Sequence, residues 1–167
     1  MRGVLRMELR GPDGAVLAVR GGGNAVMRSG GDLVARLFAG QGAPITHMAV
    51  GTDDTPESGD FATAALRNEA VGDVPALAGA VEAAIPPDAF TFETDTARRV
   101  VKVRLRATLP ANAAVGIVRE AGLLARDGDT ATLYNRITFA PVTKGDDHEL
   151  TMFWEVSFPY GDLAWMP

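Results

Sequence analysis

The stretch Val101-Lys102-Val103-Arg104-Leu105-Arg106-Ala107-Thr108-Leu109 decides the fold class of this chain. Its odd-numbered residues are apolar, and its even-numbered residues are basic or polar. Successive side chains of a strand point to opposite faces of a sheet, so this alternation predicts a half-buried β-strand. One face of the strand is apolar, and the other carries a basic stripe made of Lys102, Arg104 and Arg106.

Segments on either side of this strand repeat the pattern. Phe90 and Phe92 are predicted to lie on its hairpin partner, joined to it by a polar turn at 95–97. Further strands are predicted at 115–124, at 133–139 and at 152–158, where Met152, Trp154, Val156 and Phe158 face inward. Short strands at this spacing, separated by turn residues, are typical of an antiparallel β-sandwich.

The N-terminal part predicts a hairpin over residues 4–20. Leu5, Met7 and Leu9 alternate with charged residues, and the turn Gly11-Pro12-Asp13-Gly14 follows. Proline at the second position and glycine at the fourth suit a type I turn. The returning strand is expected to turn Ala15, Leu17 and Val19 inward, and Gly21-Gly22-Gly23-Asn24 is expected to form a loop.

Between the hairpin and the C-terminal strands the sequence predicts one short helix. It starts near Ser29 and ends before Gly40, which occupies a position that favours a C-terminal glycine. A strand is expected at 45–50. Residues 61–70 are compatible with one or two helical turns, and the Ala-rich stretch that ends at Pro86-Pro87 is compatible with helix or with extended chain. The predicted fold is therefore mainly β, an antiparallel β-sandwich with one short α-helix, in a single domain over residues 1–167.

Composition limits the classes of function. The chain has no cysteine, which excludes disulfides, thiol nucleophiles and Cys-ligated metal sites. Its net charge of −5 and pI of about 5.0 disfavour nucleic-acid binding. No apolar run approaches the ~18 residues that a membrane-spanning helix needs, so we expect no membrane insertion. The N-terminus lacks the apolar core of a signal peptide.

Candidate catalytic and metal-binding residues are few. His47 lies in an apolar run, where packing is the simpler interpretation, and His148 has no second histidine three or four positions away to close a metal site. None of the three serines lies in a G-x-S-x-G motif. The acidic loop 52–60 is interpreted as solvated, with weak calcium binding as the alternative. We expect no enzymatic activity, no cofactor and no bound metal.

Three features are candidate interface elements. Glu120 lies in a run that otherwise looks buried, so it is expected either to form a structural ion pair with an arginine of the sheet or to serve at an interface. The basic stripe is interpreted as a solvated outer face or as a contact for the acidic loop of a neighbouring copy. Leu163, Trp165 and Met166 make the C-terminal segment unusually apolar, which favours docking on a neighbouring subunit or folding back onto the chain itself.

Several short stretches, in this order, resemble segments of phage tail-associated structural proteins. They are ITHMAVGT (45–52), LRNE (66–69), REAGL (119–123), LYNR (133–136) with FAPVTK (139–144), and LTMFWEV (150–156). The resemblance covers most of the chain. It implies a structural subunit of a phage tail, such as a collar or fibre-attachment protein, or of a phage-like contractile particle. It also implies synthesis in the bacterial cytoplasm, other tail proteins as partners, and a homo-oligomer.

Two competing functions stay open at this point. One is a carbohydrate- or receptor-binding β-sandwich module at a tail tip, which would need exposed Trp or Tyr side chains as a sugar platform. The other is a small hydrolase whose catalytic residues are not recognisable from their spacing. The first hypothesis, a structural subunit that mediates assembly or attachment between tail components, agrees best with the residues and with the resemblance.

Overall fold

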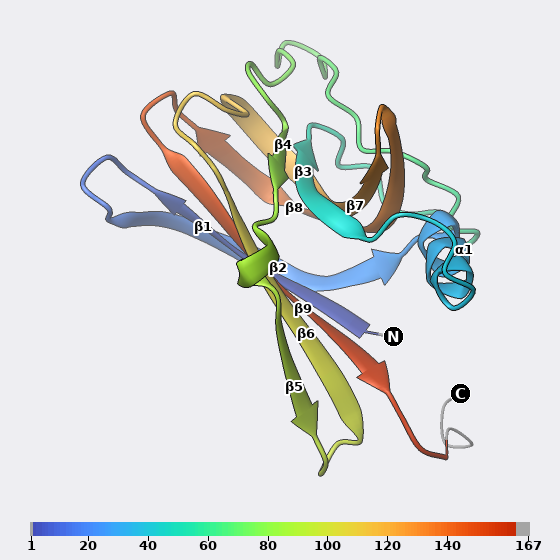
Figure 1. Ribbon diagram of the computed structural model, residues 1–167. Coiled ribbons are helices and arrows are strands. Elements are labelled where there is room, and N and C mark those ends of the chain that lie inside the picture. Colours follow the sequence, from blue (N-terminus) through green and yellow to red (C-terminus); the bar gives the residue numbers. More distant parts are fainter. Residues whose placement is uncertain (1, 163–167) are drawn as a thin grey trace.

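The computed structural model describes residues 2–162, and in them nine strands form one antiparallel sheet. The strand order is β4-β3-β7-β8-β2-β1-β9-β6-β5, and the sheet curls into a half-barrel (Figure 1). This confirms the predicted mainly β, antiparallel fold with one helix. The strands are β1 (Arg2–Arg10), β2 (Val16–Val26), β3 (Ile45–Gly51), β4 (Glu82–Ala84), β5 (Thr91–Asp95), β6 (Val100–Leu109), β7 (Gly116–Asp127), β8 (Thr130–Lys144) and β9 (Glu149–Pro159).

The sheet bends at β2. This strand pairs with β1 along most of its length but with β8 only at Ala25 and Val26, so β2 and β8 diverge beyond that point. The Arg20 side chain spans the opening, where it donates hydrogen bonds to the carbonyl oxygens of Ala140 at 3.1 Å and Pro141 at 3.2 Å. The two halves of the curled sheet thus face each other like the layers of a sandwich.

Two predictions for β2 were wrong. A β-bulge at Leu9 and Arg10 shifts the register, so Ala18 rather than Leu17 lies opposite Leu9 on the inner face. Leu17 and Val19 are 52% and 45% exposed as a result. The glycines at 21–23 also continue the strand and form no loop, because they pair with Leu5 and its neighbours in β1. A Cβ at Gly21 would overlap the Leu5 carbonyl oxygen, so the close approach requires glycine.

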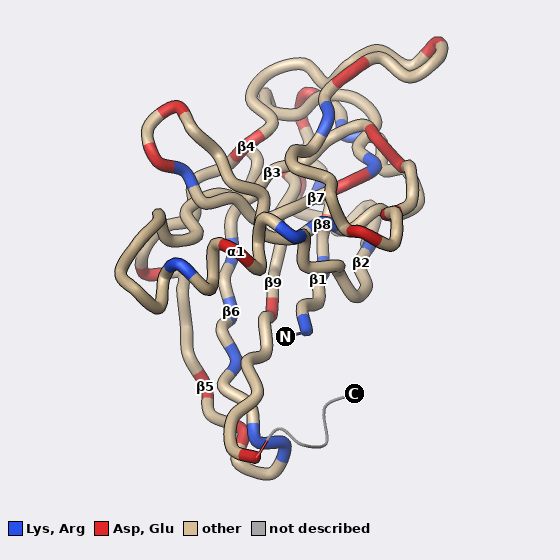
Figure 2. Tube along the Cα trace, turned by 90° about the vertical axis from the view of Figure 1, so that its right-hand side faces the viewer, with Lys and Arg blue, Asp and Glu red and all other residues tan. Residues whose placement is uncertain are grey.

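The alternation that predicted β6 is present in the structure. Leu105, Ala107 and Leu109 are buried, while Arg104 and Arg106 point to the outer face of the sheet. Figure 2 shows the basic residues as blue segments along β6. On the same face, Arg104 lies opposite Glu155 of β9, and Arg106 lies opposite Phe153.

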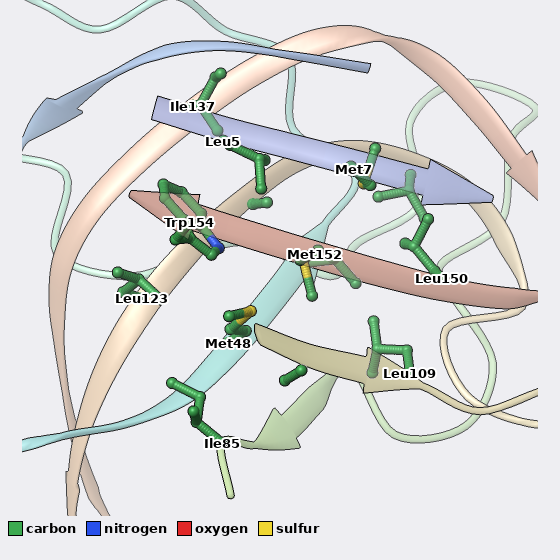
Figure 3. Packing of buried hydrophobic residues seen from close by; sticks show 14 of the residues in the cluster. Leu5, Met7, Met48, Ile85, Leu109, Leu123, Ile137, Leu150, Met152 and Trp154 are labelled. Atoms are coloured by element: carbon green, nitrogen blue, oxygen red, sulfur yellow. The ribbon is translucent and has the colours of Figure 1, made fainter. Parts of the chain in front are cut away.

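The core fills the inside of the curl. Trp154 and Met152 of β9 pack between the inner side chains of β1 and those of β3 and β7 (Figure 3). Trp154 is 1% exposed and Met152 is fully buried, which confirms the predicted inward face of the last strand. Because both halves of the sheet contribute, the core joins segments that are far apart in the sequence.

The helix α1 (Arg28–Leu37) and the segment 61–87 complete the fold. The helix confirms its prediction and packs on β8, where the Ser29 hydroxyl donates to the Leu133 carbonyl oxygen at 2.6 Å. The segment 61–87 is largely irregular; it contains β4 and runs into a single 3-10 turn, η1 (Pro87–Ala89). The helical turns expected at 61–70 are not formed, and in the Ala-rich stretch before Pro86 only Glu82–Ala84 is a strand.

Two adjacent glycines in α1 give a prediction with opposite signs. A Cβ at Gly30 would overlap the Tyr134 carbonyl oxygen, whereas a Cβ at Gly31 would meet nothing within 4 Å. We expect Gly30→Ala to lower the free energy of unfolding by about 1–3 kcal/mol through overpacking. Gly31→Ala should raise it by about 0.5–1 kcal/mol, because alanine favours the helix. Urea titrations of both variants measure the difference, and equal effects would contradict the packing of α1 on β8.

Candidate functional site

Glu120 of β7 and Arg136 of β8 form a buried ion pair on the outer side of the sheet. The Arg136 Nε atom lies 2.5 Å from Glu120 Oε2, and the two side chains are 2% (Arg136) and 1% (Glu120) exposed. This confirms the structural alternative predicted for Glu120, with Arg136 as the partner. Because its carboxylate is enclosed within its own chain, Glu120 presents no charge to a neighbouring subunit.

The same pair holds the long loop between β3 and β4. Arg136 Nη1 donates to the Thr55 carbonyl oxygen at 2.9 Å and to Glu57 Oε1 at 2.5 Å. Glu120 Oε1 accepts the backbone N–H of Arg67 at 2.7 Å. We refer to Glu120, Arg136 and Glu57, together with these backbone groups, as the charge clamp. It fastens the long loop between β3 and β4 to the sheet at two places, around 55–57 and at Arg67.

Burial acts on the pKa values of both Glu120 and Arg136 in the clamp. It raises the pKa of Glu120, and hydrogen bonds from Arg67 and Arg136 offset part of that rise. Burial acts to lower the pKa of Arg136, but hydrogen bonds to Glu120 and Glu57 outweigh it and hold this pKa above its ordinary value. The guanidinium therefore stays charged, and Glu120 depends on it for compensation.

Other residues of the segments 45–52 and 66–69 hold the chain in the same manner. The Thr52 hydroxyl donates to the Glu69 carbonyl oxygen at 2.7 Å. Asn68 exchanges two hydrogen bonds with the backbone of Leu77, at 2.7 and 3.1 Å. Gly51 is required beside them, because a Cβ there would overlap Glu120 Oε1. These residues thus give the irregular loop a fixed path.

Lys144 is a second buried charge, 1% exposed. Its ammonium donates to the carbonyl oxygens of Pro110 at 2.9 Å and Ala111 at 3.0 Å, in the connection from β6 to β7. Burial lowers the pKa of Lys144, and the carboxylates of Glu149 and Asp146 oppose this shift. Like the charge clamp, Lys144 fixes a connection between strands.

The basic stripe on β6 is mostly paired within its own chain. Arg104 contacts Glu93 at 2.5 Å and Glu155 at 2.8 Å, and Lys102 lies 3.4 Å from Asp95. Within residues 2–162 no carboxylate lies close enough to Arg106 to form an ion pair. Of the three predicted interface cations, Arg106 is thus the one that remains available to another molecule.

A shallow groove of about 570 Å³ lies on the outer face beside η1. The sequence patterns gave no sign of it, since its residues come from β1, β5, β6, β9 and η1. Across the groove, Phe153 of β9 lies in register between Arg6 of β1 and Arg106 of β6. The residues that matter for its chemistry are Val4, Arg6, Asp88, Arg104, Arg106 and Phe153.

The other sequence candidates occupy ordinary positions. The His47 Nδ1 atom lies 2.9 Å from the Thr46 hydroxyl, and His148 Nδ1 accepts the Gly145 N–H at 2.9 Å. In the described part of the chain there is no group of three or more His, Cys, Asp or Glu residues placed to hold a metal ion. No helix among the described residues is long and apolar enough to cross a membrane. Leu163, Trp165 and Met166 lie outside the described residues.

Comparison with family models, curated proteins and solved structures gives no significant match to this chain.

Proposed function

We propose that the chain is a structural subunit of a phage tail or phage tail-like particle, in which it joins neighbouring tail components. The resemblance of its short segments to tail proteins motivates the assignment. The roles of those segments support it, because Thr52, Asn68, Glu120, Arg136 and Lys144 all serve to hold connections rigid. A subunit that transmits load between its neighbours needs such a rigid body.

The observation that carries the proposal is the edge strand β5. It ends the sheet order, so its outer backbone groups have no strand partner among the described residues. Phe92 on this strand is 73% exposed. An exposed edge with a large apolar side chain is a liability in an isolated chain and a ready surface for strand pairing with a neighbour. In an assembly this edge gains a partner.

The alternative function, carbohydrate or receptor binding at a tail tip, has less support. A sugar platform requires exposed Trp or Tyr side chains, but Trp154 and Tyr134 are 1% and 3% exposed. Tyr160 is 37% exposed, and the strongly exposed aromatic residues are Phe38 and Phe92. Docking of the C-terminal segment 160–167 on a neighbouring subunit stays a prediction, because its residues 163–167 lie outside the described residues.

The test is the composition of particles from the source cells. Tail-like particles are purified by sedimentation and digested, and their proteins are quantified by mass spectrometry. We expect the chain to be present at a fixed ratio to the other tail proteins in every intact preparation. Recovery of the chain only from the soluble fraction, with none in intact particles, would overturn the proposal.

A further inference from the structure

Of the two ends of the sheet, β5 is the one left open in the described part of the chain. It pairs with β6 alone, over the five residues Thr91–Asp95. At the other end of the strand order, β4 packs against β6, and so does η1, which precedes β5. Figure 1 shows β5 as the outer strand at the lower end of the sheet, away from α1. Another strand can therefore reach the backbone groups on its free side.

The strand β5 lacks the features that normally prevent an edge strand from pairing. Proline, lysine and β-bulges are the usual ones. The strand contains neither proline nor lysine, and its register with β6 is unbroken. Its two acidic side chains have partners in their own chain, since Glu93 contacts Arg104 at 2.5 Å and Asp95 lies 3.4 Å from Lys102. The edge is thus regular, and its charges are already compensated.

The apolar inner face of the sheet continues to this edge. Val103 of β6 shares the face of the buried Leu105, and Phe92 of β5 lies opposite Val103. Next to them, Val101 lies opposite Phe158 of β9. Val101, Val103 and Phe158 are half-buried, whereas Phe92 in the outermost strand is 73% exposed. A further strand beside β5 would cover Phe92 and extend the same apolar face, which favours pairing at this edge.

A second copy of β5 matches the residues of the first. Two antiparallel copies related by a two-fold axis keep their apolar faces on one side only when residues of the same face lie opposite each other. An axis at Phe92 places the two phenyl rings side by side and Glu93 opposite Thr91. An axis at Glu93 or Asp95 would place two identical carboxylates opposite each other, and an axis at Thr94 would place Glu93 opposite Asp95. Like charges directly opposite are destabilising, so the register centred on Phe92 is favoured.

We propose that β5 pairs with β5 of a second copy, antiparallel and with Phe92 opposite Phe92, so that the two sheets become continuous across a two-fold axis. This inference rests on the proposed function and names the partner of the edge strand. Such a contact uses the same surface on both copies, so it closes as a dimer. The remaining surface of each copy stays free for other tail components.

Disulfide trapping tests the register, because the chain has no cysteine of its own. Full-length Phe92→Cys and Thr94→Cys proteins are mixed and oxidised, and the linked peptides are quantified by mass spectrometry. In the proposed register the two Cα atoms at position 92 lie about 4.5–5.5 Å apart, which suits a disulfide. Those at position 94 lie about 13 Å apart along the strands, and the diagonal pair of positions 92 and 94 lies about 7–8 Å apart.

We expect the product that joins two chains at position 92 to exceed each of the other two products at least about tenfold, since paired thiols react at a high effective concentration. Thr94 is the matched control, because it is exposed and lies on the same face of the same strand. Comparable yields of all three products would indicate random collisions, and a dominant product between positions 92 and 94 would indicate an axis at Glu93. Either result would overturn the proposed contact.

Light scattering of the Phe92→Lys variant provides the second measurement. The mass of the wild type should rise with concentration from the 17.5 kDa of one chain towards twice that value. The variant should keep the circular dichroism spectrum of the wild type and stay at the mass of one chain, because lysine on an edge strand opposes pairing. Phe38→Lys is the control, since Phe38 is 92% exposed but follows α1, and this variant should still form the dimer.

The two proposals fail in different ways. A wild-type chain that stays monomeric at every concentration would overturn the contact between copies, which is the result expected if β5 pairs with a strand of a different tail protein. Presence of that monomeric chain in intact particles would leave the proposed function standing. Absence of the chain from particles would instead overturn the proposed function.

Discussion

Replacing Arg136 with methionine should lower the free energy of unfolding by about 3–5 kcal/mol, because it leaves the Glu120 carboxylate buried without its cation. The side chains of Arg136 and Glu120 are 2% and 1% exposed, so water does not replace the lost partner. The variant also loses the hydrogen bonds from Arg136 to Thr55 and Glu57, which hold one arm of the long loop. Urea unfolding followed by circular dichroism measures the change.

A surface arginine provides the matched control. Arg104 contacts two carboxylates, Glu93 and Glu155, but its side chain is 50% exposed. Arg104→Met should therefore change stability by no more than about 1 kcal/mol, as is usual for exposed ion pairs. If the two methionine variants were equally stable, the charge clamp would not be buried as described.

The pH dependence of the Arg136→Met variant follows from Glu120. Without its cation, the buried carboxyl group has a folded-state pKa raised still further above its unfolded value. A carboxyl group with a raised folded pKa favours folding at low pH and loses this contribution as pH rises through the folded pKa. The loss caused by the substitution should thus be smaller at about pH 5 than at about pH 8, and an additional Glu120→Gln substitution should remove most of this difference.

The strands with clear alternation could be predicted from the sequence, because one face of each strand packs in the apolar core and the other face contacts water. In β6, Leu105 faces the core and Arg104 faces water, so apolar and basic residues alternate along the sequence with a period of two. In β2 the bulge opposite Leu9 reversed the expected faces. A bulge depends on how two strands pair, so it cannot be predicted from the sequence of either strand alone.

The candidate site was predictable only in part. A charged residue in a buried run requires a partner, which is why an ion pair was expected for Glu120. Its partner Arg136 and the loop residues that complete the charge clamp are brought together by tertiary folding, since Arg136 lies 79 positions from Glu57. The groove likewise combines five separate elements. Its central row of Arg6, Phe153 and Arg106 exists only through the pairing of β1, β9 and β6.

Trp154→Ala should lower the free energy of unfolding by about 3–5 kcal/mol, through lost transfer energy and the cavity that remains. Trp154 is 1% exposed and packs between Leu5 and Leu105 on the neighbouring strands. Its indole N–H has no hydrogen-bond partner among residues 2–162, so the side chain contributes by packing alone. Trp154→Phe should consequently lower the free energy of unfolding by less than Trp154→Ala.

As a control, Phe92→Ala removes an aromatic side chain that is 73% exposed and should change the free energy of unfolding by no more than about 0.5 kcal/mol. A melting temperature for Trp154→Ala close to that of the wild type would contradict a core position for the indole.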